Sequence, residues 1–155
     1  MAKVSRQEKY PDTEVFCYYN RNPKNRITTD CVLRAISTGL DIPYNQVAME
    51  MTQLHCETGY DSHSPYTIDK YLKSKGWVKC KQPRKYDNTK YTGEEFCLKL
   101  QHPIYCEELG LPDCNWHRMI ANIGGHHIVA IVEGKVHDIW DSTGGCIGNV
   151  WVLPL

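Results

Sequence analysis

Apolar positions recur at helical spacing in the first two thirds of the chain and gather into short strand-like runs in the last third. Residues 1–14 are polar and we expect them to be flexible, whereas the run at 15–19 (VFCYY) is β-prone. N-cap residue types at 28–30 precede the apolar run 31–37, which predicts a helix that ends at Gly39. The spacing predicts three further helices, at 43–58, 66–75 and 93–100.

The pattern changes after residue 115. A short strand is predicted at 77–78, but the main strands are expected at 119–123, 128–132, 136–140 and 150–153. Glu133-Gly134 predicts a two-residue hairpin turn between the second and third of these. Helices followed by an antiparallel sheet predict an α+β fold, and no repeat, low-complexity tract or linker divides residues 1–155 into more than one domain.

Composition and charge exclude several classes of protein. The chain has 155 residues, 18 Lys+Arg against 18 Asp+Glu, and 23% charged residues. This balance argues against a disordered tail and against a nucleic-acid clamp driven by positive charge, so we expect no nucleic-acid partner. No apolar run approaches the roughly 18 residues that span a membrane. The N-terminus lacks the apolar core of a secretory signal, so we expect a cytoplasmic protein without a membrane partner.

The eight cysteines allow three interpretations. Disulfides need an oxidising compartment, and the cytoplasm, where we expect this protein, is reducing. Structural zinc would have to use Cys106, Cys114 and His117, with a further ligand from Cys97 or His102, because the chain has no C-x-x-C pair. The third interpretation, which we favour, is reduced thiols of which one is selected for chemistry. It requires neither a metal nor another cofactor.

Cys31 is the best nucleophile candidate among these thiols. It lies where the predicted helix begins, and the unpaired N–H groups at a helix start stabilise the reactive thiolate. The alternative is that Cys31 is a small apolar residue on the core face of that helix. His126 and His127 stand at the start of the strongest predicted strand, where a histidine can act as general base. Successive strand residues point to opposite faces, so only one of the two can face the helices.

A carboxylate on the returning strand would fix the tautomer of that histidine. Pairing about the hairpin turn places His127 near position 140 or 141, so Asp141 is the predicted partner. Asp138 should sit nearer the turn and is the weaker candidate. The alternative for Asp141 is a strand-end cap formed with Ser142.

Acyl transfer also needs hydrogen-bond donors for an oxyanion. The backbone N–H of Cys31, at the helix start, is one candidate donor. Asn25, six residues upstream, is the candidate for a second donor through its side-chain amide. The alternative for Asn25 is a polar loop residue without a role in chemistry.

Two segments resemble small proteins encoded by bacteriophages and prophages. The stretch TDCVLRAI at 29–36, with TG at 38–39 and PY at 43–44, is similar to their DCVxRA…TG…PY opening. The stretch GHHIVAIVEGKVHDIWDS at 125–142 is similar to their GH-x-VAV-x-DG-x-x-x-D-x-WD segment. A cysteine on an early helix, followed much later by a His-strand-turn-strand-Asp unit, also resembles the papain-like cysteine peptidase superfamily.

This resemblance implies a papain-like fold with a site of Cys31, His127 and Asp141. It selects His127 over His126, because the family's apolar strand follows it directly. The implied function is a thiol hydrolase or acyl transferase, most directly a cysteine peptidase or isopeptidase that takes a protein or peptide substrate in the cytoplasm of a bacterial host. The alternative is a catalytically retired phage protein that acts by binding, as an inhibitor of host defence or a virion component.

Overall fold

The computed structural model describes residues 3–102 and 107–155, which fold around a mixed six-stranded sheet. The strands lie side by side in the order β1-β5-β4-β3-β6-β2. Their bounds are β1 Phe16–Tyr18, β2 Val78–Cys80, β3 Arg118–Ile123, β4 His127–Val132, β5 Lys135–Asp138 and β6 Ile147–Val152. Neighbouring strands pair antiparallel, except that β1 runs parallel to β5 at one edge.

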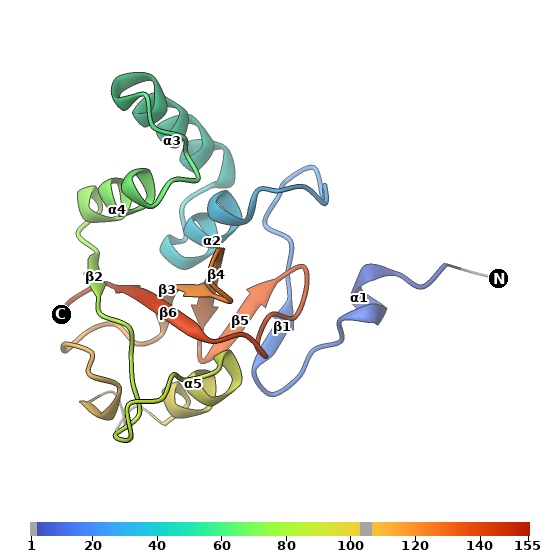
Figure 1. The fold of residues 1–155 in the computed structure, drawn as a ribbon. Coiled ribbons are helices and arrows are strands. Elements are labelled where there is room, and N and C mark those ends of the chain that lie inside the picture. The colour runs from blue at the N-terminus through green and yellow to red at the C-terminus, as the bar shows by residue number, and fades with distance from the viewer. Residues whose placement is uncertain (1–2, 103–106) are drawn as a thin grey trace.

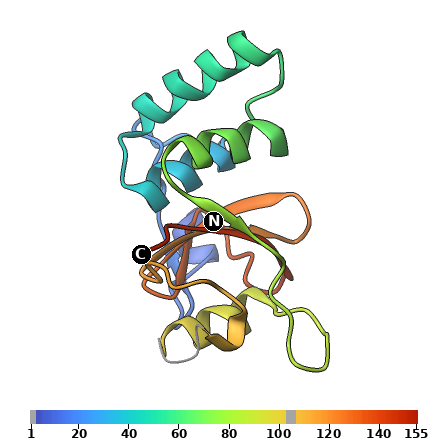
Figure 2. The same ribbon diagram turned by 90° about the vertical axis from the view of Figure 1, so that its left-hand side faces the viewer.

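Helices cover both faces of this sheet (Figures 1 and 2). One face carries α2 (Cys31–Leu40), α3 (Tyr44–Thr58) and α4 (Pro65–Ser74), and the other carries α5 (Gly93–Leu100). Alternation along β4 sends Ile128 and Ala130 into the core with α2–α4, and sends Val129 and Ile131 into the core with α5. Two short helical turns complete the described chain, α1 (Arg6–Lys9) and the 3-10 turn η2 (Glu107–Leu109).

Local sequence signals account for most element ends. The α5 helix begins with a capping box, in which Thr92 accepts from the Glu95 N–H while the Glu95 side chain accepts from Thr92. Gly59 ends α3 in the left-handed region, at φ 74°. Glu133 and Gly134 both have positive φ, as the tight turn between β4 and β5 requires, and they set Val132 opposite Lys135.

The α+β class predicted from the sequence is confirmed, but three details of that prediction were wrong. The sheet is mixed, because β1 from the first half of the chain adds in parallel to β5. The polar first segment contains a capped helical turn, α1, and Arg6 donates to the Ile139 carbonyl at 2.6 Å. Gly39 does not end α2; a Cβ there would lie 2.3 Å from Ile120 Cδ1, so this glycine lets the helix approach β3 closely.

Within residues 3–102 and 107–155, no helix combines the length and the apolar character needed to cross a membrane.

Candidate active site

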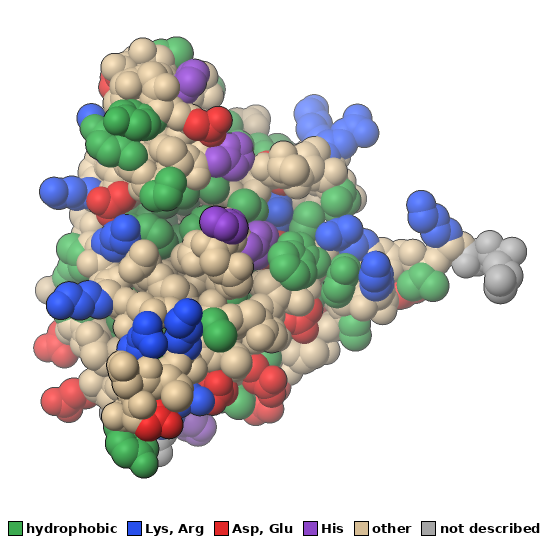
Figure 3. Space-filling view, viewed as in Figure 1, with side chains coloured by type: hydrophobic (Ala, Val, Ile, Leu, Met, Phe, Trp, Pro, Cys, Tyr) green, Lys and Arg blue, Asp and Glu red, His purple; other side chains and the backbone are tan. Residues whose placement is uncertain are grey.

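Cys31 is the first residue of α2, and its side chain is half-buried. The preceding residue, Asp30, occupies the N-cap position, but its side chain makes no capping hydrogen bond to the helix. The N–H groups of the first turn therefore keep no acceptor within the helix, which leaves the positive end of the helix dipole directed at the thiol. Figure 3 shows histidine side chains gathered on one face, around the junction of α2 and β4.

His127 is the first residue of β4, and it links the thiol to a carboxylate. Its side chain is hydrogen-bonded to Cys31. The Nε2 atom of His127 lies 2.5 Å from Asp138 Oδ2. Since Nε2 is engaged by the carboxylate, Nδ1 is the nitrogen left for the sulfur. The tertiary structure thus brings together a thiol, an imidazole and a carboxylate from α2, β4 and β5.

The carboxylate against His127 is Asp138, and the prediction that Asp141 fills this place was wrong. Asp141 Oδ1 instead accepts from the Thr143 N–H at 3.0 Å and the Thr143 hydroxyl at 2.6 Å, so it caps a turn after β5. Strand register explains the difference. With Val132 opposite Lys135, position 127 lies opposite 140, and alternate residues share a face, so Asp138 is on the same face as His127 and position 141 is not.

A buried arginine holds this carboxylate in place. Arg34 on α2 makes an ion pair with Asp138 and a second one with Asp30, whose Oδ1 lies 2.8 Å from Arg34 Nε. All three side chains are at least nine-tenths buried. Asp30 also accepts from the Tyr44 hydroxyl at 2.7 Å and from Asn22 Nδ2 at 3.0 Å. Because the network holds two carboxylates and one guanidinium, a positive charge on His127 balances it.

The pKa of the Cys31 thiol is lowered and the pKa of the His127 imidazole is raised. Burial raises the pKa of Cys31, but the hydrogen bonds from His127 and the Ile128 N–H and the charges of His127 and Arg34 outweigh it, so the pKa lies below its usual value. Burial lowers the pKa of His127, but its hydrogen bonds to Asp138 and Cys31 raise it to about 9. Both shifts favour the form of the pair in which the imidazole carries the proton and the sulfur is a thiolate.

Trp140 covers the outer side of His127, with ring centroids 4.8 Å apart. The two residues border a cleft of about 250 Å³ whose lining also includes Gly124, Gly145 and Asp141. Ser142 also lines this cleft, and its buried hydroxyl has no hydrogen-bond partner in the described part of the chain. The cleft therefore reaches the imidazole of His127.

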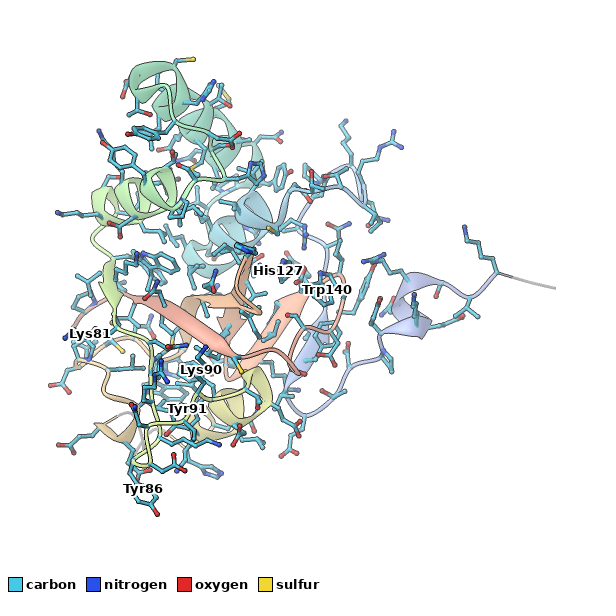
Figure 4. All side chains as sticks on the ribbon, in the orientation of Figure 1. Lys81, Tyr86, Lys90, Tyr91, His127 and Trp140 are labelled. Carbon is cyan, nitrogen blue, oxygen red and sulfur yellow. The ribbon has the colours of Figure 1, made fainter. Side chains whose placement is uncertain are left out.

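A larger cavity lies away from this chemistry. It has a volume of about 980 Å³ and is lined by residues of the 84–91 loop and of α5, among them Tyr86 and Tyr91. In Figure 4, His127 and Trp140 lie near α2, whereas Tyr86 and Tyr91 lie toward α5. The thiol and its partners are therefore not part of the larger cavity.

Asn25 is not brought to the thiol. It lies in an exposed loop at a positive φ of 52°, and its side-chain oxygen accepts from Asn20 Nδ2 at 3.4 Å. Its side-chain oxygen is thus engaged with its own loop, and no contact of Asn25 among the described residues supports the predicted oxyanion role.

The other cysteines differ from Cys31 in their surroundings. Six described cysteines are free thiols, at positions 17, 31, 56, 80, 97 and 146. Cys106, a ligand in the zinc interpretation that we did not favour, lies outside the described residues. Among residues 3–102 and 107–155, no group of three or more His, Cys, Asp or Glu side chains is arranged to hold a metal ion. The pKa of Cys31 is lowered, whereas burial raises the pKa values of Cys17, Cys80 and Cys97.

Sequence reasoning missed Asp30, Arg34 and Asp138 as parts of one network. Two signals were present in the sequence. Asp30 and Arg34 are spaced i, i+4 at a helix start, which brings their side chains together, and the two-residue turn fixes the strand register that selects Asp138. The contact between Arg34 and Asp138 spans 104 residues of sequence and had no local signal.

Comparisons of the chain with protein-family models, with curated proteins and with solved structures gave no match in any of the three. The role of this site is therefore argued from the contacts of its own residues.

Proposed function

We propose that this protein is a thiol hydrolase or acyl transferase of papain-like type that cleaves or transfers peptide or isopeptide bonds. Cys31 is the nucleophile, His127 the general base and acid, and Asp138 the residue that orients His127. The observation that carries the proposal is the hydrogen-bonded chain from the Cys31 thiol through His127 to the Asp138 carboxylate. The order of these residues along the sequence matches the order implied by the resemblance to papain-like peptidases.

The chemical steps follow from the protonation state of the pair. The Cys31 thiolate attacks the substrate carbonyl carbon, and His127 gives its proton to the departing amine as the carbon–nitrogen bond breaks. The acyl group remains on the sulfur as a thioester. His127, now neutral, takes a proton from water, which attacks the thioester and releases the acid and the thiolate. If an amine replaces the water, the same steps transfer the acyl group.

The start of α2 supplies the oxyanion site in this proposal. The Cys31 N–H and the next N–H groups of the first turn have no acceptor within the helix, and the Asp30 side chain does not cap them. These donors lie beside the carbonyl that the sulfur attacks, where negative charge develops. The Asp30 side chain bonds to Arg34, Tyr44 and Asn22 instead of capping the helix. The network that holds Asp138 therefore also leaves the N–H donors of the first turn uncapped.

The substrate class follows from the shape of the site. The cleft beside His127 and Trp140 has three glycines among its lining residues, which leaves room for the backbone of an extended peptide on the leaving-group side. We propose that the substrate is a protein or peptide of a bacterial cytoplasm, in line with the resemblance to bacteriophage proteins. Trp140 shields the hydrogen bond between His127 and Asp138 from water, which keeps that bond strong.

The test compares the reactivity of individual thiols at limiting iodoacetamide, read by mass spectrometry of the peptides. Cys56 and Cys146 are more exposed than Cys31 and serve as internal controls. We expect Cys31 to react fastest at pH 6, because the neighbouring His127 imidazolium favours its thiolate form. Labelling of Cys31 no faster than labelling of the two controls would refute the proposal.

Turnover is tested next with a library of fluorogenic peptide amides and with peptide vinyl sulfones. The wild-type protein should form an adduct at Cys31, the Cys31→Ala variant should form none and release no fluorophore, and Cys56→Ala should behave as wild type. A biological effect that persists in a folded Cys31→Ala variant would instead support the binding protein without catalysis.

A further inference from the structure

A second histidine reaches the segment that carries the nucleophile. His63 lies in the loop between α3 and α4, and its Nε2 is 3.0 Å from the carbonyl oxygen of Thr29, two residues before Cys31. Its charge also interacts with that of Cys31. The mechanism proposed above gives His63 no role.

The hydrogen-bond partners of His63 determine its protonation. On one side Nε2 faces the Thr29 carbonyl, and on the other Nδ1 faces Asp61 Oδ1 at 3.1 Å. Both partners accept hydrogen bonds only, and a neutral imidazole carries a single N–H. The Ser62 hydroxyl also lies 3.3 Å from Nδ1 and could donate to it, but the shorter contact with Asp61 and the contact with Thr29 are satisfied together only by the doubly protonated, positively charged ring.

The charges around His63 also favour its protonated form. Burial lowers the pKa of His63, but the contacts with Asp61 and Thr29 and the charges of Asp61 and Cys31 outweigh it, so the pKa is raised. Asp61 is the acidic group of its own loop, and Cys31 is the titratable group that faces it from α2. From α3, His55 acts on Asp61 rather than on His63 directly.

The loop is held rigidly enough to place this charge. Asp61 accepts from the His63 N–H at 2.7 Å through its side chain and from the Thr67 hydroxyl at 2.7 Å through its carbonyl. Ser64 caps α4 by accepting from the Thr67 N–H. Because Thr67 is buried in α4, the loop is anchored to a packed helix.

We propose that His63 is a positioning residue for Cys31: its imidazolium holds the backbone that leads into the nucleophile and adds a second positive charge that stabilises the thiolate. The site then has two His–Asp pairs with different tasks. His127 with Asp138 transfers protons, and His63 with Asp61 keeps a fixed charge. The inference rests on the proposed function, because it takes Cys31 as the nucleophile.

The experiment measures the rate of Cys31 alkylation by iodoacetamide from pH 4.5 to 9 and needs no substrate. His63→Gln keeps an N–H donor for the Thr29 carbonyl but removes the charge. We expect its alkylation midpoint to rise by about half a pH unit or more, which slows the reaction about threefold or more at pH 6. The plateau rate at high pH should stay unchanged, and His63→Lys should restore the midpoint toward the wild-type value.

Two further variants separate charge from structure. Asp61→Asn removes the carboxylate that holds His63 protonated, so its midpoint should also rise. His55→Gln loses a contact of the same loop, the 2.8 Å hydrogen bond between His55 Nδ1 and the Tyr60 carbonyl, without changing the charge next to Cys31. Its midpoint should equal that of the wild type.

The outcomes distinguish this inference from the proposed function. A low wild-type midpoint that is the same in His63→Gln and Asp61→Asn overturns the inference and leaves the proposed function standing. A wild-type midpoint at the ordinary cysteine value, near about 8.5, overturns both. A rise in His63→Gln that His63→Lys does not reverse also overturns the inference, since the effect would then not come from charge.

Discussion

Replacing Arg34 by methionine tests whether the buried ion network holds the candidate site together. Met keeps an unbranched aliphatic side chain but is shorter than Arg and carries no charge, so it leaves the carboxylates of Asp30 and Asp138 buried without their cation. Those carboxylate side chains are 7% and 2% exposed, so water cannot replace the lost partner. Breaking a buried ion pair costs about 3–5 kcal/mol. For a chain of this length, that corresponds to a melting temperature lowered by about 6–20 °C.

The assay is urea unfolding followed by tryptophan fluorescence, with calorimetry as a second probe, under reducing conditions. Lys75→Met is the matched control, because Lys75 and Glu50 form an ion pair at 2.9 Å whose side chains are 29% and 35% exposed. The control should lose less than about 1 kcal/mol. Adding Asp30→Asn to Arg34→Met removes one orphaned charge and should recover part of the loss.

The loss should also depend on pH. In the wild-type protein burial raises the pKa of Asp30, but the contacts with Arg34, Tyr44 and Asn22 outweigh it and keep the pKa below its ordinary value. A carboxyl with a lowered folded pKa stabilises the fold above its unfolded pKa, and that stability is lost as pH falls through the folded pKa. Without Arg34, protonation of Asp30 removes its buried, unpaired charge. The difference in the free energy of unfolding between wild type and variant should therefore shrink from pH 7 to pH 4. A loss under about 1 kcal/mol at pH 7, or a difference that grows toward pH 4, would refute this reasoning.

Three further predictions follow from single contacts. Asp138→Asn should lower turnover by on the order of 10²-fold or more, because His127 loses the group that orients it, whereas Asp141→Asn, which changes only a residue that lines the cleft, should lower kcat/KM much less; the reverse order would restore Asp141 to the site. Gly39→Ala should cost about 1–3 kcal/mol in urea unfolding, because the new Cβ meets the Ile120 side chain, and a stability equal to wild type would show that this side chain turns aside without strain. Burial raises the pKa of Cys97 to about 12, so this thiol should resist iodoacetamide at pH 8 in the folded protein and react in concentrated guanidinium chloride; rapid labelling of the folded protein would contradict its burial.

Much of the local structure was predictable because its signals are local. The prediction placed a helix at 93–100, where α5 lies, because its apolar residues recur at helical spacing, and in the structure a capping box, also a local signal, starts this helix. The turn at Glu133-Gly134 was predicted for the same kind of reason, since two residues with positive φ between apolar runs make a hairpin. Local signals of the same kind predicted the helix that begins at Cys31 and the strand that begins at His127.

The edge strand β1 shows where local signals end. The run at 15–19 was identified as β-prone, but nothing in it specifies a parallel neighbour more than a hundred residues later. The hairpin signal fixed how β4 meets β5, and only the packed sheet placed β1 beside β5. The sequence alone therefore predicted an antiparallel sheet where the folded chain has a mixed one.

The sequence by itself determined which residues carry reactive groups and which helix or strand end each of them occupies. Only the tertiary structure decided the carboxylate of the site, because Asp138 is held by Arg34 from another layer of the fold as well as by strand register. The same holds for His63, which meets Thr29 across 34 residues of sequence. Helix caps and tight turns are set by neighbours a few residues away, whereas buried charges select their partners by proximity in the folded core, where an unpaired charge is costly.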